Sequence, residues 1–173
     1  TNVIDGFGAL FLRMGHYHYA KKLHEESLKS YSALLDRNHP TLLYARFNLS
    51  TALMKEGRID KALAEHEEIL DIRKDTIGHV HKDLASSLHV IGVCMIHKGE
   101  YLEARSHIER SLNIRKKLLG MEHPDVAESL QSLGMLCSQQ GKLVESMVYY
   151  ERALNNRRVS LGSQHPLVAE TLC

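Results

Sequence analysis

The chain has few cysteines and prolines, no long apolar run and no excess of either charge. Among its 173 residues, 22 lysines and arginines stand against 21 aspartates and glutamates, so the formal net charge is +1. The chain therefore lacks the excess of positive charge that binds nucleic acid or an anionic membrane surface. No apolar stretch approaches the roughly 18 residues that a bilayer-spanning helix needs. The composition therefore argues against a nucleic-acid or membrane partner.

The scarce cysteines also exclude a disulfide framework. Cys94, Cys137 and Cys173 are odd in number and fit no metal-ligand spacing. We interpret them as reduced thiols and expect a cytoplasmic protein. The first residues include neither an initiator methionine nor the basic segment and apolar core of a signal peptide. We expect the chain to be part of a longer protein.

What the chain does contain is repetition. The same residue types return every 42 positions, without insertions. A fixed period in the range of about 20–50 residues marks a solenoid of stacked units, and solenoids serve mostly as binding scaffolds. The recurring columns are Gly15, Gly57, Gly99 and Gly141; His39, His81, His123 and His165; Ala20, Ala62, Ala104 and Ser146; Gly8, Ser50, Gly92 and Gly134; and Leu28, Leu70, Leu112 and Leu154.

Each repeat reads as an antiparallel helix pair. In residues 123–162, apolar residues at helical spacing follow Pro124, which suits the first turn of a helix. Gly141 ends this helix, and a second apolar pattern runs to Gly162. Small residues at Gly134 and Ser146 mark where the two helices cross. We predict one array over residues 1–173, with repeats at 1–42, 43–84, 85–126 and 127–168 and a partial repeat at 169–173.

These positions resemble the tetratricopeptide repeat, which has small residues at repeat positions 8, 20 and 27 and glycine at position 15. The segments LNIRKKLLGMEHPDVA and LNNRRVSLGSQHPLVA look like the kinesin-light-chain subclass. The chain departs from the pattern at Lys82, which replaces proline, and at Asp36, which replaces glycine. The resemblance implies an all-α, right-handed superhelical solenoid of antiparallel helix pairs. The usual repeat has about 34 residues, so the period of 42 adds eight residues per repeat, which we expect to lengthen the second helix.

The resemblance further implies a concave groove lined by repeat positions 2, 5, 9, 12 and 13 of the first helices. A basic row at position 13 would lie beside an apolar row at position 12, which suits an extended peptide with acidic residues and apolar anchors. The apolar row has an alternative interpretation as core, and the basic row as a plain solvated surface. The candidate peptide-binding residues are Arg13, Lys55, His97, Gln139, Asp5, Phe47, His89, Gln131, Tyr44, Leu12, Met54 and Ile96.

The twelve histidines invite a metal interpretation that their spacing does not support. The column that includes His39 and His81 is spread one residue per repeat, so its members cannot share an ion. We expect each to occupy a helix start, with its ring packed or hydrogen-bonded locally. The sequence predicts no catalytic residue, no metal site and no cofactor. A further row, Arg73, Arg115 and Arg157, is a candidate to pair with an acidic residue of an adjacent repeat.

We therefore expect a non-catalytic protein–protein interaction scaffold or adaptor that binds a peptide or partner protein. The alternative is a regulatory or sensor array of a multidomain signalling NTPase or protease. The sequence shows no polar terminal repeat of the kind that caps a solenoid. Self-association through uncapped ends is a further expectation.

Overall fold

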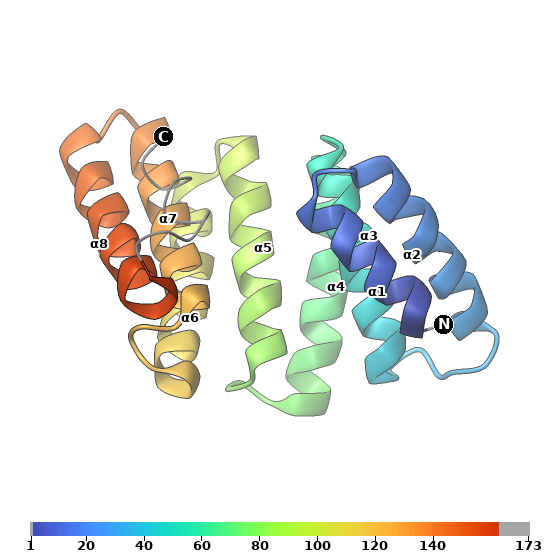
Figure 1. Ribbon diagram of the computed structural model, residues 1–173. Coiled ribbons are helices and arrows are strands. Elements are labelled where there is room, and N and C mark those ends of the chain that lie inside the picture. The colour runs from blue at the N-terminus through green and yellow to red at the C-terminus, as the bar shows by residue number, and fades with distance from the viewer. Residues whose placement is uncertain (1, 163–173) are drawn as a thin grey trace. The chain divides into compact units, whose positions relative to one another are not determined.

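The computed structural model describes residues 2–162, and every regular element in that range is an α-helix (Figure 1). Consecutive helices form antiparallel pairs: α1 with α2, α3 with α4, α5 with α6, and α7 with α8. The predicted all-α fold of helix pairs is confirmed. None of the helices in this range is long and apolar enough to cross a membrane. The helices are α1 (Asn2–Arg13), α2 (Tyr17–Ser32), α3 (Pro40–Lys55), α4 (Ile59–Ile77), α5 (Lys82–Lys98), α6 (Tyr101–Leu119), α7 (Pro124–Gln139) and α8 (Leu143–Leu161).

The helix pairs group into two compact units, Thr1–Gly78 and His79–Cys173. In the first unit, α2 packs against both its partner α1 and the next first helix, α3. In the second unit, α6 packs in the same way against α5 and α7. Each unit therefore contains one complete junction between successive repeats.

Left-handed glycines make the turn inside each pair. At Gly99, φ is +81°, and its N–H donates to the carbonyl of Ile96 over 3.0 Å while Glu100 N–H donates to Met95 over 3.0 Å. This arrangement satisfies carbonyls at the helix end that have no partner within the helix, and only glycine adopts it without strain. The predicted turns are confirmed, with φ of +79° at Gly15, +83° at Gly57 and +73° at Gly141.

The repeated histidines cap the first helices. The Nδ1 atom of His39 accepts the backbone N–H of Thr41 over 3.2 Å, and that of His123 accepts the N–H of Asp125 over 3.2 Å. His81 does the same for Asp83 at 3.1 Å, although Lys82 replaces the usual proline. The predicted place at the helix start is confirmed for these three histidines, and His165 lies outside the described residues.

The first repeat differs in structure from the later repeats at the same place where its sequence differs from theirs. Its second helix, α2, has 16 residues, whereas α4, α6 and α8 each have 19. The longer helices are followed by glycines with positive φ, such as Gly78 at +74°. Asp36 holds the equivalent position in the first repeat, and a residue with a side chain enters the left-handed region only at a cost. α2 therefore ends three residues earlier, at Ser32.

Small residues stand where the paired helices cross, as predicted. Ser146 on α8 donates its hydroxyl to the carbonyl of Gly134 on α7 over 2.8 Å. In the preceding pair, a Cβ on Gly92 would lie 3.1 Å from the carbonyl oxygen of Ala104 and 2.5 Å from Cγ1 of Ile108. A Cβ on Gly134 would meet the ring of Tyr150 at 3.2 Å. The glycines thus make room for a bulky residue one turn beyond the crossing.

Candidate functional site

The row predicted to be basic is exposed at the ends of the first helices. Arg13 and Lys55 close α1 and α3, and His97 and Gln139 lie in the last turns of α5 and α7. Cations at a helix C-terminus are also favoured by the helix dipole. The exposed row therefore has a structural explanation as well as the capacity to attract an anionic ligand.

The apolar row does not line a groove as a whole. Met54 is 7% exposed and Ile96 is 4% exposed, so both side chains belong to the core. Leu12 is half-buried. Of the two interpretations open for this row, core holds for Met54 and Ile96, because both side chains are buried. They are withdrawn as peptide anchors.

The column at position 5 faces its own second helix. The hydroxyl of Tyr31 donates to Asp5 over 2.6 Å, and the guanidinium of Arg157 donates to Gln131 over 2.6 Å. The guanidinium carbon of Arg73 lies 4.9 Å from the centre of the Phe47 ring. Position 31 therefore meets position 5 of the same repeat in each of these three pairs. Asp5 is 5% exposed, so only a small part of its side chain can reach a ligand.

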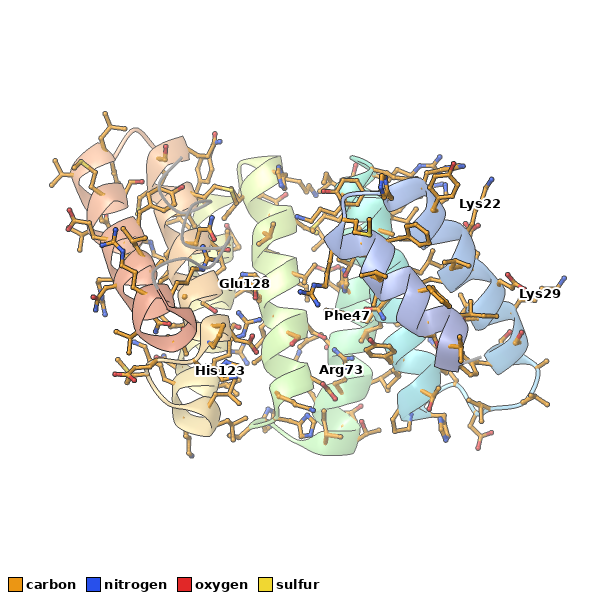
Figure 2. The ribbon with its side chains drawn as sticks, viewed as in Figure 1. Lys22, Lys29, Phe47, Arg73, His123 and Glu128 are labelled. Atoms are coloured by element: carbon orange, nitrogen blue, oxygen red, sulfur yellow. The ribbon has the colours of Figure 1, made fainter. Side chains whose placement is uncertain are left out.

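In the second repeat, the Phe47 ring lies next to Arg73 (Figure 2). The ring also meets the imidazole of His66 edge-on, with 4.9 Å between ring centres. His66 is fully buried, and neither ring nitrogen has a hydrogen-bond partner among the described residues. Burial, with a smaller contribution from the charge of Arg73, lowers the pKa of His66 to about 3. The imidazole is therefore neutral at physiological pH.

A second buried histidine lies in the first repeat. His24 is fully buried, and its Nδ1 lies 3.4 Å from an Asp5 carboxylate oxygen. Burial lowers the pKa of His24, although Asp5 opposes the shift. A Cβ on Gly8 would lie 2.6 Å from the His24 ring, so this histidine fills the space that glycine leaves. His24 and His66 are thus core residues.

A polar cluster bridges the two repeats of the second unit. Arg115 on α6 binds Glu128 on α7 over 3.0 Å and donates to Ser129 Oγ over 2.8 Å. His89 on α5 contacts Ser132 Oγ through Nε2 at 2.9 Å, and its Nδ1 lies 3.8 Å from Glu128. Arg115 thus pairs with an acidic residue of the adjacent repeat, as predicted for its row. Arg73 and Arg157 contact position 5 of their own repeats.

The cluster also changes the pKa of Glu128. Burial by itself would raise the pKa of the Glu128 carboxyl, but the positive charges of His89 and Arg115 outweigh it and hold that pKa below its usual value. The Ser132 hydroxyl, the His89 imidazole and the Glu128 carboxylate follow one another in the order of a hydrolytic triad. The 3.8 Å between Nδ1 and Glu128 is too long for the hydrogen bond that would orient the imidazole. The geometry is that of an ion-pair cluster that ties two repeats together.

The first unit has a surface pocket of about 420 Å³ between its two first helices. It is lined by Asp5, Gly6, Pro40, Thr41 and Tyr44. Tyr44 is 47% exposed and supplies an aromatic side to the pocket. Sequence reasoning named Asp5 and Tyr44 but not Pro40 or Thr41, because those two lie at a helix start rather than at the family's groove positions.

The residues that the structure describes contain no cluster of metal-binding side chains. No three His, Cys, Asp or Glu side chains within residues 2–162 come together in a way that could hold an ion. The thiols of Cys94 and Cys137 are both buried. Burial raises the pKa of Cys137, against the influence of the neighbouring Arg105.

The helix pairs, their left-handed turn glycines and their small crossing residues define a helical repeat protein. The sequence model of the tetratricopeptide repeat matches residues 1–75 and 83–158. The chain belongs to the tetratricopeptide repeat family. No curated protein matches the chain in sequence.

Solved structures agree with this fold. The nearly identical TPR-like repeats assigned to a kinesin light chain of Podosopora anserina superpose with a TM-score of 0.75 at 22% identity, covering 98% of this chain and 80% of that one. BtubC (BKLC) from P. vanneervenii gives 0.77 at 21% identity, over 97% and 67% of the two chains. A Rap protein complexed with Competence and Sporulation Factor gives 0.75 at 14% identity, over 97% and 50%. At these identities the likeness concerns the fold alone.

Proposed function

We propose that the chain is a non-catalytic protein-interaction module that binds an extended, acidic peptide segment along the first helices of its first unit. The observation that carries this proposal is the pocket beside Tyr44 together with the exposed cations Arg13 and Lys55 on the same two helices, α1 and α3. The pocket offers an apolar and aromatic anchor site. The two cations offer attraction for carboxylates.

The spacing of these features sets the length of the ligand. Asp5 lines the pocket and Arg13 lies eight residues further along α1. At about 1.5 Å per helical residue, this places the basic end about 12 Å from the pocket. An extended peptide advances about 3.3 Å per residue, so an anchor side chain and an acidic side chain about four residues apart would span the two.

In the second unit the same row carries less charge. His97 adds attraction only when its imidazole is protonated, and Gln139 adds none. The first unit is therefore the stronger candidate for an acidic ligand at neutral pH. That this fold can carry a bound partner is supported by the Rap protein structure, which is complexed with a factor.

The test is titration of labelled synthetic peptides that carry a leucine or phenylalanine four residues from a pair of aspartates. Lys55→Glu should weaken binding about tenfold at low salt, with a smaller difference at high salt, since exposed charges are screened over about 8–10 Å at physiological ionic strength. Folding stability should hardly change, because exposed ion pairs contribute little to it.

Lys22→Glu is the matched control. Lys22 is also exposed, but it lies on the second helix α2 (Figure 2). Its replacement by glutamate changes the net charge by the same amount as Lys55→Glu. The proposal predicts full affinity for this variant. Equal weakening by both substitutions would mean that only net charge matters, and would refute a site on α1 and α3.

A further inference from the structure

Exposed side chains form a row with a palindromic spacing along the outer face of α8. Successive members are four, three, one, three and four residues apart, so they all lie on one side of the helix. The three valines among them are 80%, 49% and 55% exposed. The row, which we call the α8 stripe, consists of Val144, Val148, Glu151, Arg152, Asn155 and Val159.

The stacking of successive repeats leaves this face uncovered. On α6, which is followed by the whole fourth repeat, the residues equivalent to the α8 stripe are all exposed. Leu102, which corresponds to Val144, is 79% exposed there. On α4 the equivalent residues are also exposed, apart from the half-buried Glu68. Covering the α8 stripe therefore requires an element that is not part of the stacking.

Two copies of the α8 stripe match each other. In a two-fold contact, residue i of one copy meets residue j of the other, and j meets i in return. If two α8 helices pack antiparallel with the two-fold axis between Glu151 and Arg152, the palindromic spacing brings the two stripes into register. The facing pairs, each formed twice, are Val144 with Val159, Val148 with Asn155, and Glu151 with Arg152. The contact would join apolar side chains at both ends and form two ion pairs at its centre.

Charge supports a second copy of the chain as the occupant of this face. Glu151 and Arg152 are both exposed, and neither has an ion-pair partner among residues 2–162. An antiparallel second copy supplies the opposite charge to each of them. The net charge of +1 causes little repulsion between copies.

The other long second helices are not self-complementary in this way. On α4, the corresponding contact would place Asp60 against Asp75, and facing like charges oppose association. On α6, Leu102 would face Lys117. The combination of apolar ends and a centre of opposite charges therefore distinguishes α8 from α4 and α6.

A hollow beside the α8 stripe offers room for a side chain of the second copy. It has a volume of about 220 Å³, and Asn155 and Val159 form part of its wall. Val126 and Leu130 of α7 also line it. Val144 of the second copy, which faces Val159, would therefore lie next to apolar side chains from two helices.

We infer that the α8 stripe is a self-association surface through which two copies of the chain pair as an antiparallel, two-fold dimer. One helix from each copy makes a small interface, so the dimer should be reversible, with dissociation in the micromolar range. The surface uses none of the residues of the proposed peptide site. The Lys55→Glu variant should therefore dimerise like the wild type, so failure of either proposal is recognisable on its own.

The test is sedimentation equilibrium of the whole chain from low micromolar to near-millimolar concentration. We expect a monomer–dimer equilibrium. Glu151→Arg and Arg152→Glu should each weaken dimerisation about tenfold or more, because each turns both central ion pairs into like-charge contacts. The double variant, which exchanges the two residues, should restore dimerisation, since both ion pairs form again.

Matched controls separate the α8 stripe from effects of net charge and of surface hydrophobicity. Glu67→Arg makes the same charge change at the equivalent exposed position of α4 and should dimerise normally. Val144→Ser should weaken dimerisation, whereas Leu102→Ser, at the equivalent position of α6, should not. All of these residues are exposed, and thermal melting checks that each variant stays folded.

Several outcomes would overturn the inference. They are a monomer at all concentrations, unchanged dimerisation of Glu151→Arg, and growth beyond the dimer, since a two-fold contact closes at two copies. Failure of the double variant to recover would rule out the pairing of Glu151 with Arg152, and with it the two-fold register.

Discussion

Replacing the buried His66 by isoleucine should stabilise the protein and remove part of its sensitivity to acid. Both ring nitrogens lack partners among the described residues, and an unsatisfied buried polar group costs about 1–3 kcal/mol. The edge-on contact with Phe47 would be lost, which offsets about 1 kcal/mol of the gain. The third repeat already has isoleucine here, Ile108, which is fully buried. We expect His66→Ile to raise the free energy of unfolding at neutral pH by about 1 kcal/mol.

The pH dependence follows from the lowered pKa. Burial, and secondarily Arg73, lowers the pKa of folded His66 to about 3, against an ordinary value of about 6.5 in an unfolded chain. Between these values the unfolded chain binds a proton that the folded chain does not, so stability falls as pH is lowered from about 6.5 towards 3. At about 1.4 kcal/mol per pH unit, acidification from about pH 7 to about pH 5 should cost about 2 kcal/mol through His66 alone.

The assay is urea unfolding followed by circular dichroism at several pH values for the wild type, His66→Ile and His18→Gln. The gap between His66→Ile and the wild type should widen by about 2 kcal/mol as pH falls from about 7 to about 5. His24 remains in all three proteins, so its own titration cancels in the comparison. The ring of His18 is 61% exposed, so His18→Gln is the control for replacing a surface histidine. Parallel profiles for His66→Ile and the wild type would refute the reasoning.

Two further predictions concern the helix framework. Gly134→Leu should destabilise the second unit by about 1–3 kcal/mol, because its Cβ already meets the Tyr150 ring at 3.2 Å, whereas Gly6→Leu has open space and should be tolerated; thermal melting compares the two. His123→Ala should cost about 1 kcal/mol by removing the acceptor for the Asp125 N–H, and His123→Asn should restore most of it; equal melting temperatures for these two variants would contradict a capping role.

The period of 42 residues was enough to predict the helix pairs, the glycine turns and the capping histidines. Each of these depends on local chemistry: a left-handed glycine, an acceptor at a helix start, or an apolar spacing. The shorter α2 was signalled by Asp36, whose consequence for helix length becomes visible only in the structure. The crossing residues were also predictable, because small side chains have few other reasons to recur.

The candidate site was less predictable, because side-chain partners are set by packing. Met54 looked like a groove residue from its position in the repeat, yet it is buried. The sequence did not indicate that His24 and Tyr150, both at position 24 of their repeats, fill the space beside Gly8 and Gly134. The pocket beside Tyr44 joins residues from two helices and has no sequence signature. Whether the exposed Lys55 binds a ligand stays a prediction.

The contacts between positions 5 and 31 bear on how such a chain can change over evolutionary time. Tyr31 matches Asp5, Arg73 matches Phe47, and Arg157 matches Gln131, each within one repeat. Duplication or loss of a whole 42-residue segment carries both members of a pair together. Recombination between the two helices of a repeat would place a guanidinium where a phenol stood, or a carboxylate opposite the wrong partner. Gene rearrangements in this chain should therefore be tolerated mainly at the histidine-capped junctions, which separate one matched pair from the next.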